Sequence, residues 1–214
     1  MKFTILIIAA YLTGSIPFAM IIAKAYGKDL RKIGSGNIGA TNLSRAVGKK
    51  WAYFCFILDT TKGLIPMLIA SKIISSPPTT TELLLSLLVG CAAIAGHMFP
   101  VYIKFKGGKG VATSFGVAMG LWPYYSLCAL IAMACWISSV LIWRYISLAS
   151  IIAAISFPIA LTTITILNKA WQFNNLWPLF IAAIIIPLMV IIRHRENVIR
   201  IIKGKEHKTF SKKN

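Results

Sequence analysis

Long apolar runs are the feature that most constrains the fold of this chain. About 20 apolar residues are enough for a helix to span the hydrocarbon core of a bilayer. Charged residues make up 13% of the sequence, against about 25% in soluble domains. We therefore predict an all-α integral membrane protein with seven transmembrane helices. The runs cover residues 3–23, 51–74, 83–103, 111–122, 124–143, 146–167 and 176–192.

The segment 111–143 fits either one tilted helix or two shorter helices. Its residues 122–125 are Trp-Pro-Tyr-Tyr. This combination places a helix-breaking proline among aromatic residues that favour the membrane interface. We predict two helices, at about 111–122 and 124–143, joined by a tight external turn.

The basic residues predict the orientation, because cytoplasmic loops collect Lys and Arg. Seven of them lie in 24–50, three in 102–110, one is Arg144 and eight lie in 193–214, so 19 of 23 fall on alternate connections. With an odd number of spans, this pattern predicts an external amino terminus and a cytoplasmic carboxyl terminus. The other connections, 75–82, 122–125 and 168–176, hold only Lys169.

Other organisations of the chain are less well supported. The first apolar run is longer than the 7–15 residues of a signal-peptide core. The net charge of +18 would suit nucleic acid, but the basic residues are spread over membrane loops instead of one soluble face. The four cysteines show no metal or disulfide spacing. We predict one polytopic membrane domain over 1–202 and a loosely ordered basic cytoplasmic tail over 203–214, with no nucleic-acid partner, metal or cofactor.

Three polar clusters lie on the predicted cytoplasmic face, and the first covers residues 34–45. Its sequence, Gly-Ser-Gly-Asn-Ile-Gly-Ala-Thr-Asn-Leu-Ser-Arg, has three glycines and no acidic residue. Such a turn is rich in hydrogen-bond donors, and an arginine binds phosphate through two parallel hydrogen bonds. An ordinary connector is the alternative, but the missing acids favour an anion site. The candidate ligands are Ser35, Asn37 and Arg45.

The second cluster is the glycine- and lysine-rich segment 104–116. Its core, Gly-Gly-Lys-Gly, lacks the spacing of a nucleotide-binding P-loop. Glycines let successive N–H groups converge on one anion, and the following helix adds the positive end of its dipole. A flexible loop with snorkelling lysines is an equal alternative. The candidate phosphate ligands are Gly107, Gly108, Lys109 and Gly110, with Lys106 as an additional residue.

Two histidines near the membrane edge are candidate functional groups. His97 lies close to the end of the third run, where an ionisable residue is a functional candidate by default; the alternative is a histidine bonded to a nearby carbonyl. The third cluster, residues 193–200, follows the last run. Its His194 and Asn197 share a face if that helix continues. The charges around them also fit a topogenic signal with Glu196 and Arg200 as an i,i+4 pair. Such a signal needs neither His nor Asn.

Two further polar pairs have i,i+3 spacing. Asp59 lies about 12 Å into the second helix, one turn before Lys62. Because a partner lowers the cost of burying either charge, we predict a structural ion pair, with Lys62 as an additional site candidate. Ser147 and Ser150 begin the sixth helix, where serines commonly bond their own backbone. We predict Ser150 as a phosphate ligand and Ser147 as an additional one.

Because all the clusters fall on one predicted face, we expect them to converge on a site that holds phosphate groups beside lipid. This placement indicates chemistry on phosphorylated lipid precursors. One rival is an anion or phosphate transporter, which would need polar groups that continue to the outer face. Another is a non-catalytic scaffold whose basic loops bind anionic lipid.

Several separated motifs also follow one another in a characteristic order. They are Gly-Ser-Ile-Pro-Phe at 14–18, residues 35–42 with Arg45, Asp-Thr-Thr-Lys-Gly at 59–63, Gly96-His97 with Phe99-Pro100, residues 105–113, and His-Arg-Glu-Asn at 194–197. Together they resemble the acyl-phosphate:glycerol-3-phosphate acyltransferases, the PlsY family. The resemblance covers nearly the whole chain.

The resemblance implies transfer of a fatty acyl group from acyl phosphate to the 1-hydroxyl of glycerol 3-phosphate. The products would be lysophosphatidic acid and phosphate, in the first acylation of phospholipid synthesis at the bacterial inner membrane. It also implies seven helices with an external amino terminus. By resemblance, Ser35 and Arg45 belong to the essential first motif, residues 107–110 bind glycerol 3-phosphate, and His194 and Asn197 belong to the third motif.

The residues leave the general base open between His194, His97 and a substrate phosphate oxygen. Arg45, Lys109 and the glycine-loop amides are candidates for stabilising the oxyanion. The sequence contains neither H-x-x-x-x-D nor G-x-S-x-G, so the thioester-using acyltransferases and a covalent acyl-enzyme are not indicated. The predicted partners are glycerol 3-phosphate, acyl phosphate and the lipid bilayer; the oligomeric state stays open.

Overall fold

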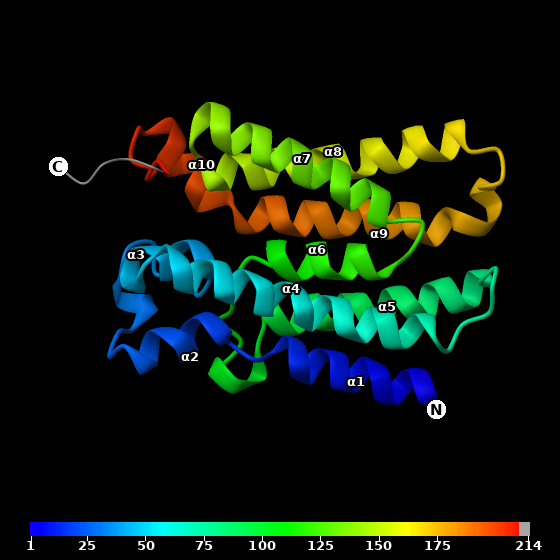
Figure 1. Ribbon diagram of the computed structural model, residues 1–214, viewed down its shortest axis with the longest axis horizontal. Coiled ribbons are helices and arrows are strands. Elements are labelled where there is room, and N and C mark those ends of the chain that lie inside the picture. Colours follow the sequence, from blue (N-terminus) through cyan, green and yellow to red (C-terminus); the bar gives the residue numbers. More distant parts are fainter. Residues whose placement is uncertain (210–214) are drawn as a thin grey trace. The chain divides into compact units, whose positions relative to one another are not determined.

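Helices account for all regular structure in residues 1–209, the part of the chain that the computed structural model describes. Two units follow one another in the sequence, divided between Leu121 and Trp122. Figure 1 shows their helices. Unit 1 contains α1 (Lys2–Gly14), α2 (Phe18–Ala25), the 3-10 turn η1 (Leu30–Lys32), α3 (Ala40–Val47), α4 (Lys49–Ser71), α5 (Thr80–Met98), the 3-10 turn η2 (Val101–Ile103) and α6 (Val111–Gly120). Unit 2 contains α7 (Ser126–Trp143), α8 (Ile146–Leu167), α9 (Phe173–Arg193) and α10 (Arg195–Ile202).

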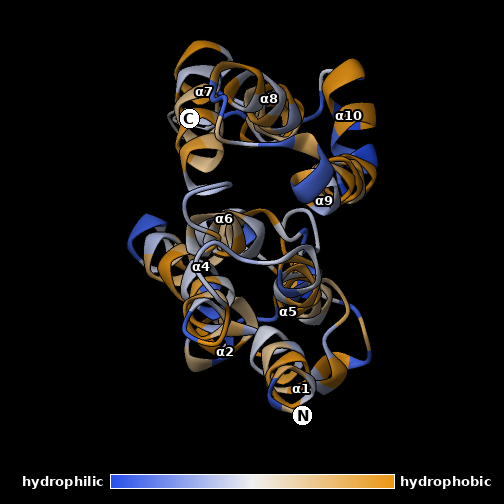
Figure 2. Ribbon diagram, turned by 90° about the vertical axis from the view of Figure 1, so that its right-hand side faces the viewer, coloured by the Kyte–Doolittle hydropathy of each residue, from blue (hydrophilic) through white to orange (hydrophobic). Residues whose placement is uncertain are grey.

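The long helices have the length and composition of membrane spans, and the predicted all-helical architecture is confirmed. Within residues 1–209, six segments are long and apolar enough to cross a bilayer. Large apolar side chains remain on the surface, such as Ile166 at 75% exposure, and hydrophobic residues cover much of the long helices (Figure 2). The short helix predicted at 111–122 is present as α6, whose ten residues extend about 15 Å. The six segments are Lys2–Ala25, Lys49–Ser71, Thr80–Ile103, Ser126–Trp143, Ile146–Leu167 and Phe173–Arg193.

A break divides the first apolar segment into α1 and α2, where we predicted one uninterrupted run over 3–23. Pro17 lacks a backbone N–H and cannot continue the hydrogen-bond ladder of α1. The carbonyl of Ile16 accepts a hydrogen bond from Lys62 Nζ at 3.0 Å. The same carbonyl also accepts the Phe18 N–H at 3.1 Å, so its hydrogen-bonding capacity is satisfied at the break among apolar helices.

The predicted ion pair between Asp59 and Lys62 is confirmed in α4. Lys62 Nζ lies 2.7 Å from Asp59 Oδ1, and each side chain is only 4% exposed. His97 of α5 approaches the same carboxylate oxygen, with its Nδ1 at 3.6 Å. The spacing along α4 did not predict this third member, because it comes from another helix.

Close helix packing in unit 1 depends on glycines at the crossing points. A Cβ added to Gly116 of α6 would lie 2.0 Å from the carbonyl oxygen of Thr60 in α4. Gly63 of α4 makes a matching approach to α6, and Gly14 and Gly96 do the same between α1 and α5. Small residues of this kind let helix backbones come into direct contact. The α4–α6 contact also fixes where the chain enters α6, directly after the glycine loop.

In unit 2, α8 packs along both α7 and α9. The predicted turn before α7 is confirmed, since α6 ends at Gly120 and α7 begins at Ser126. The tail differs from the loose segment that we predicted over 203–214. Thr209 N–H donates to the Arg144 carbonyl at 2.7 Å, so residues up to 209 return to the junction of α7 and α8. Residues 210–214 lie outside the described part of the chain.

We expect Gly116→Ala to destabilise the protein. Alanine is the better helix former by about 1 kcal/mol, but its methyl group would overlap the α4 backbone, and overpacking typically costs about 1–3 kcal/mol. The thermal unfolding midpoint in detergent measures the net effect. Ala134→Val, which adds methyl groups on an exposed position of α7, is the control and should change little. A Gly116→Ala variant as stable as wild type would contradict the close helix contact.

Candidate active site

The first polar cluster is a loop organised by the buried side chain of Asn42. Its Nδ2 donates to the carbonyls of Leu30, Ile33 and Asn37 at 2.9–3.0 Å, and its Oδ1 accepts the N–H of Ser35 at 3.2 Å. The residue is only 1% exposed. Asn42 therefore ties four points of the chain together and fixes the path of the segment that carries Ser35.

Glycines bring this loop against Arg45. Gly34 and Gly36 have φ values of 56° and 69°, in the left-handed region that favours glycine. A Cβ added to Gly34 would lie 2.5 Å from Asn42 Oδ1 and 3.3 Å from Arg45 Cδ. The turn predicted at 34–45 is thus present in its first half. Its second half is the start of α3, a helix that we did not predict, and α3 carries the exposed Arg45.

The acidic residue that precedes this loop in the sequence, Asp29, forms an ion pair with a neighbouring arginine. Asp29 receives hydrogen bonds from Arg31 Nε and Nη2, both at 2.9 Å. These hydrogen bonds lower the pKa of the Asp29 carboxyl to about 2. Because its charge is matched by Arg31, Asp29 does not oppose the binding of an anion by the loop.

The second cluster is a glycine loop held against the end of α5. Gly107 N–H donates to the Met98 carbonyl at 3.2 Å, and Gly108 N–H donates to the His97 carbonyl at 3.0 Å. A Cβ at Gly108 would lie 2.1 Å from His97 Nε2, and one at Gly107 would lie 2.2 Å from the His97 carbonyl oxygen. A larger residue therefore cannot enter either position without displacing the loop or, at Gly108, the His97 ring. The role predicted for these residues as phosphate ligands stays a prediction.

The loop leads directly into α6. Gly110 has a φ of 85° and occupies the N-cap position of this helix. Lys109, half-buried, comes just before it, and Lys106 is exposed. The first N–H groups of a helix have no partner within the helix and carry the positive end of its dipole. An anion placed beside Lys109 would therefore meet both a full charge and a helix dipole.

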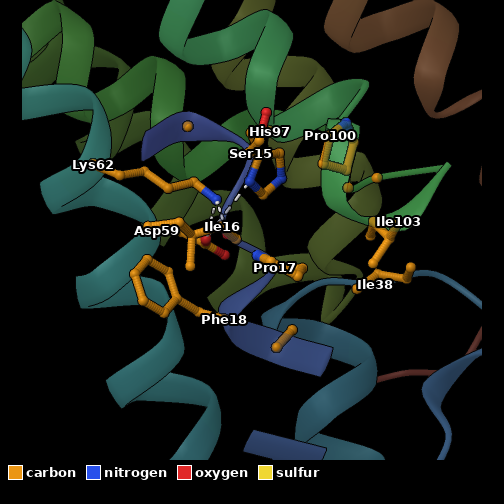
Figure 3. Close-up of a pocket in the computed structure, with 14 residues that line it drawn as sticks. Ser15, Ile16, Pro17, Phe18, Ile38, Asp59, Lys62, His97, Pro100 and Ile103 are labelled. Carbon is orange, nitrogen blue, oxygen red and sulfur yellow. Dashed lines mark hydrogen bonds and ion pairs between the residues drawn. The ribbon is translucent and has the colours of Figure 1, made fainter. Parts of the chain in front are cut away.

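A small pocket in unit 1 brings the two loops together with the ion-pair residues (Figure 3). Its cavity volume is about 10 Å³, close to the room that one water molecule needs. The structure thus joins the first loop, the glycine loop and the buried charges of α4 and α5. The lining residues that matter here are Ile38, Asp59, Lys62, His97, Gly107 and Gly108.

In unit 2, His194 and Asn197 lie at a bend between two helices. Our prediction of a shared face assumed one continuous helix, but α9 ends at Arg193 and α10 begins at Arg195. Both side chains are nevertheless buried. His194 Nδ1 lies 2.8 Å from the Val190 carbonyl oxygen. Because a carbonyl only accepts, Nδ1 carries a proton, and when the ring is neutral Nε2 is the nitrogen without one.

Glu206 is the centre of the unit 2 cluster. Its Oε1 accepts hydrogen bonds from Ser147 Oγ at 2.9 Å and Asn197 Nδ2 at 2.6 Å, and its Oε2 accepts one from Arg200 Nε at 2.8 Å. Its side chain is 5% exposed. Burial by itself would raise the pKa of the Glu206 carboxyl, but these hydrogen bonds outweigh it and the pKa is lowered. The carboxylate is therefore charged at neutral pH and fixes two predicted site residues.

Two expectations about neighbouring side chains need refinement. The predicted pair of Glu196 and Arg200 is present but long, at 3.9 Å, with the Glu196 side chain 72% exposed. Ser150 Oγ donates to the Ile146 carbonyl at 2.9 Å and accepts from Trp136 Nε1 at 3.2 Å. Its hydroxyl proton is thus used within α8, as serines in helices commonly do. The phosphate-binding role of Ser150 stays a prediction.

The order of these motifs and the helical fold match one group of known proteins. The family model described as Glycerol-3-phosphate acyltransferase matches residues 4–204. This chain belongs to that family. The resemblance identified from the sequence motifs is therefore confirmed.

Individual members of the glycerol-3-phosphate acyltransferase family are similar over almost their whole length. The glycerol-3-phosphate acyltransferase of Aquifex aeolicus is 43% identical over 208 residues, which cover 97% of this chain and 100% of the relative. The relative from Trichlorobacter lovleyi is 44% identical over 203 residues, which cover 94% of this chain and 95% of that protein.

Two crystal structures of PlsY, an integral membrane glycerol 3-phosphate acyltransferase, share the fold. The glycerol 3-phosphate form has a TM-score of 0.82 and 43% identity and covers 97% of this chain and 96% of that chain. The form with lysophosphatidic acid has a TM-score of 0.79 and 42% identity, covering 97% and 95%. With its long apolar helices, this chain is accordingly a multi-pass membrane protein.

Two residues that organise the family's motifs in this chain were missed by sequence reasoning. Asn42 was included in a donor-rich turn without a role of its own, and Glu206 was included in a loose basic tail. A signal for Glu206 was available, because it is the only acidic residue in the segment 203–214. A lone acid among bases indicates a specific partner. Asn42 offers no comparable signal, since its carbonyl partners are main-chain groups.

We expect Asn42→Leu to loosen the first loop. The change removes the donor for three carbonyls, and each such hydrogen bond contributes about 0.5–1.5 kcal/mol. Hydrogen exchange of the amides in 33–42 should become at least about tenfold faster, while that of α7 and α8 should not change. Asn174→Leu, at an exposed position in the first turn of α9, is the control. Unchanged exchange in Asn42→Leu would show that another contact holds the loop.

We expect Glu206→Gln to lower the stability of unit 2, because hydrogen bonds to a charged group contribute about 1.5–3 kcal/mol. Glu196→Gln, which alters the exposed partner of the same Arg200, should cost about 0–1 kcal/mol. Since folding lowers the Glu206 pKa, its contribution is complete above the usual value of about 4.3 and disappears as pH falls through the lowered value. Thermal unfolding from pH 8 down to about pH 2 measures both effects, because this range passes below the usual value. Equal losses in the two variants would contradict the central role of Glu206.

Proposed function

We propose that this protein transfers a fatty acyl group from acyl phosphate to the 1-hydroxyl of sn-glycerol 3-phosphate. The products are lysophosphatidic acid and inorganic phosphate. The observation that carries this proposal is the family match over residues 4–204, supported by 43% identity to a PlsY structure in its glycerol 3-phosphate form. The reaction is the first acylation of phospholipid synthesis, at the inner membrane of a bacterial cell.

The proposal includes an orientation for the active site. We count α6 as a short span, fourth in chain order, which brings the total to seven. The amino terminus then lies outside and the carboxyl terminus in the cytoplasm. The distribution of 19 of 23 basic residues on alternate connections supports this arrangement. Residues 1–202 then form one membrane domain with a basic segment after it, and the first loop, the glycine loop and the His194–Asn197 cluster each face the cytoplasm.

Positive charge is the first requirement of this reaction, because two phosphate groups must lie near one carbonyl. Lys109, Gly110 and the start of α6 hold the phosphate of glycerol 3-phosphate, and Gly107 and Gly108 let the loop approach it. Arg45, beside the Ser35 and Asn37 segment, supplies the second cationic group. Preorganised donors of this kind also stabilise the oxyanion that develops on the carbonyl oxygen.

The bond changes follow from the chemistry of a mixed anhydride. The 1-hydroxyl oxygen attacks the acyl carbon and forms the new ester bond. The tetrahedral intermediate then breaks its bond to the phosphate oxygen, and phosphate leaves with that electron pair. The hydroxyl proton goes to His194 Nε2 or to an oxygen of the donor phosphate. The Nδ1–H···O bond of His194 to Val190 supports the first route, because it fixes the tautomer that a base requires.

The decisive experiment supplies purified protein in detergent with glycerol 3-phosphate and one acyl donor at a time. We expect lysophosphatidic acid from palmitoyl phosphate and almost none from palmitoyl-CoA or palmitoyl-acyl carrier protein, because neither thioester brings a phosphate leaving group on its acyl carbon. Mass spectrometry of the lipid and release of inorganic phosphate should agree one to one.

The same preparation distinguishes the rival functions. A protein that makes no lysophosphatidic acid from palmitoyl phosphate, yet moves labelled phosphate into vesicles, would be a transporter. If lysophosphatidic acid formed from palmitoyl-CoA but not from palmitoyl phosphate, the protein would still be an acyltransferase, but the proposed acyl-phosphate donor would be wrong. Asn197→Ala should reduce turnover by at least about a hundredfold if the third motif touches the reacting groups. A non-catalytic scaffold would show neither product nor transport.

A further inference from the structure

Asp59 is the centre of a buried network in unit 1 (Figure 3). Its Oδ1 lies 2.7 Å from Lys62 Nζ and 3.6 Å from His97 Nδ1, and its Oδ2 lies 3.5 Å from Cys55 Sγ. The pair with Lys62 already compensates both charges, so ion pairing accounts for the burial of Asp59 and Lys62. It does not account for the burial of His97 beside them. The position of His97 needs a separate explanation.

His97 connects this network to the glycine loop. Its main-chain carbonyl accepts the Gly108 N–H at 3.0 Å, and its ring packs so closely on Gly108 that a Cβ there would be 2.1 Å from Nε2. One edge of the ring therefore faces Asp59 and the other faces the loop. A general base must reach the substrate hydroxyl directly or through one water. A ring enclosed on both edges is better suited to holding the loop.

Asp59 also holds the far side of the same loop. Its main-chain carbonyl accepts a hydrogen bond from Thr113 Oγ1 at 3.0 Å. Thr113 lies in the first turn of α6 and is fully buried, with 0% exposure. The two residues between Gly108 and α6 are Lys109 and Gly110. Both ends of this dipeptide are therefore tied to Asp59, one through His97 and the other through Thr113.

We infer that Asp59, His97 and Thr113 are positioning residues that hold Lys109 and Gly110 in place for the phosphate of glycerol 3-phosphate. The inference rests on the proposed function; it adds Asp59 and Thr113 to the predicted site residues and gives His97 a positioning role. None of the three side chains acts on the substrate itself. A shift of about 1 Å in a binding group costs much of its interaction. Loss of this support should weaken glycerol 3-phosphate binding and leave the chemical step nearly unchanged.

Thr113 offers the sharpest test, because valine has almost its shape and serine keeps its hydroxyl. We expect Thr113→Val to raise the KM for glycerol 3-phosphate about tenfold, with kcat and the KM for acyl phosphate within about twofold of wild type. Thr113→Ser should restore binding. Calorimetric titration of glycerol 3-phosphate gives the dissociation constant without turnover, and the unfolding midpoint confirms that each variant folds.

A double-mutant cycle tests His97. Gly108→Ala and His97→Ala should each raise the KM for glycerol 3-phosphate. The double variant should be no worse than the poorer single variant, because the new methyl group fits the space left by the ring. Coupling of this kind is what residues in direct contact show. His207→Ala, which removes an exposed histidine, is the matched control and should behave as wild type.

Each outcome decides between positioning and its alternatives. An unchanged KM in Thr113→Val, or strictly additive effects at His97 and Gly108, overturns the inference. A large fall in kcat with unchanged KM in His97→Ala also overturns it, because the histidine would then be the base. If wild-type protein makes no product, the proposed function fails, while calorimetry of wild type and Thr113→Val still decides the positioning role. No binding of glycerol 3-phosphate to wild type would overturn both.

Discussion

The pairing of Asp59 with Lys62 is the interaction on which unit 1 depends. Neither charge is stable alone among apolar helices, because an unpaired buried ion costs several kcal/mol. Once paired, the lysine still has a donor to spare, and it gives that donor to Ile16 at the break between α1 and α2. One ion pair thus also holds a lysine that, together with the Phe18 N–H, satisfies the Ile16 carbonyl at the helix break. The break in turn provides part of the pocket beside the glycine loop.

In unit 2, a buried carboxylate is likewise compensated by polar partners, and it belongs to Glu206. Glu206 accepts hydrogen bonds from a serine of α8 and from an asparagine and an arginine of α10. The arginine balances its charge, and the two neutral donors gain fixed orientations. In both units a buried carboxylate thus fixes polar side chains that come from different helices. The glycines at the α4–α6 and α1–α5 crossings add the complementary constraint, since they set backbone distances and leave no room for adjustment.

The parts of this structure that depend on local sequence were predictable. Length and hydropathy predicted the long helices, i,i+3 spacing predicted the Asp59–Lys62 pair, and the order of the motifs predicted the family. What failed depends on contacts between distant residues. The carbonyl at the break by Pro17 accepts a hydrogen bond from Lys62 of another helix, and the course of residues up to 209 is held by the contacts of Glu206 with Ser147 and of Thr209 with Arg144. No window of the sequence contains both members of such pairs.

The glycine loop shows how local and distant constraints would divide the work of binding the phosphate that we propose it holds. Its lysine and the helix after it supply an attraction that composition alone predicts. Attraction does not fix a position, however, and a flexible loop with the same charge would lose much of its binding energy in becoming ordered. In this chain the ordering precedes the ligand, because His97 and Thr113 hold the two sides of the loop to one residue of α4. The apolar surroundings strengthen that arrangement, since the hydrogen bonds that fix the loop face little competition from water.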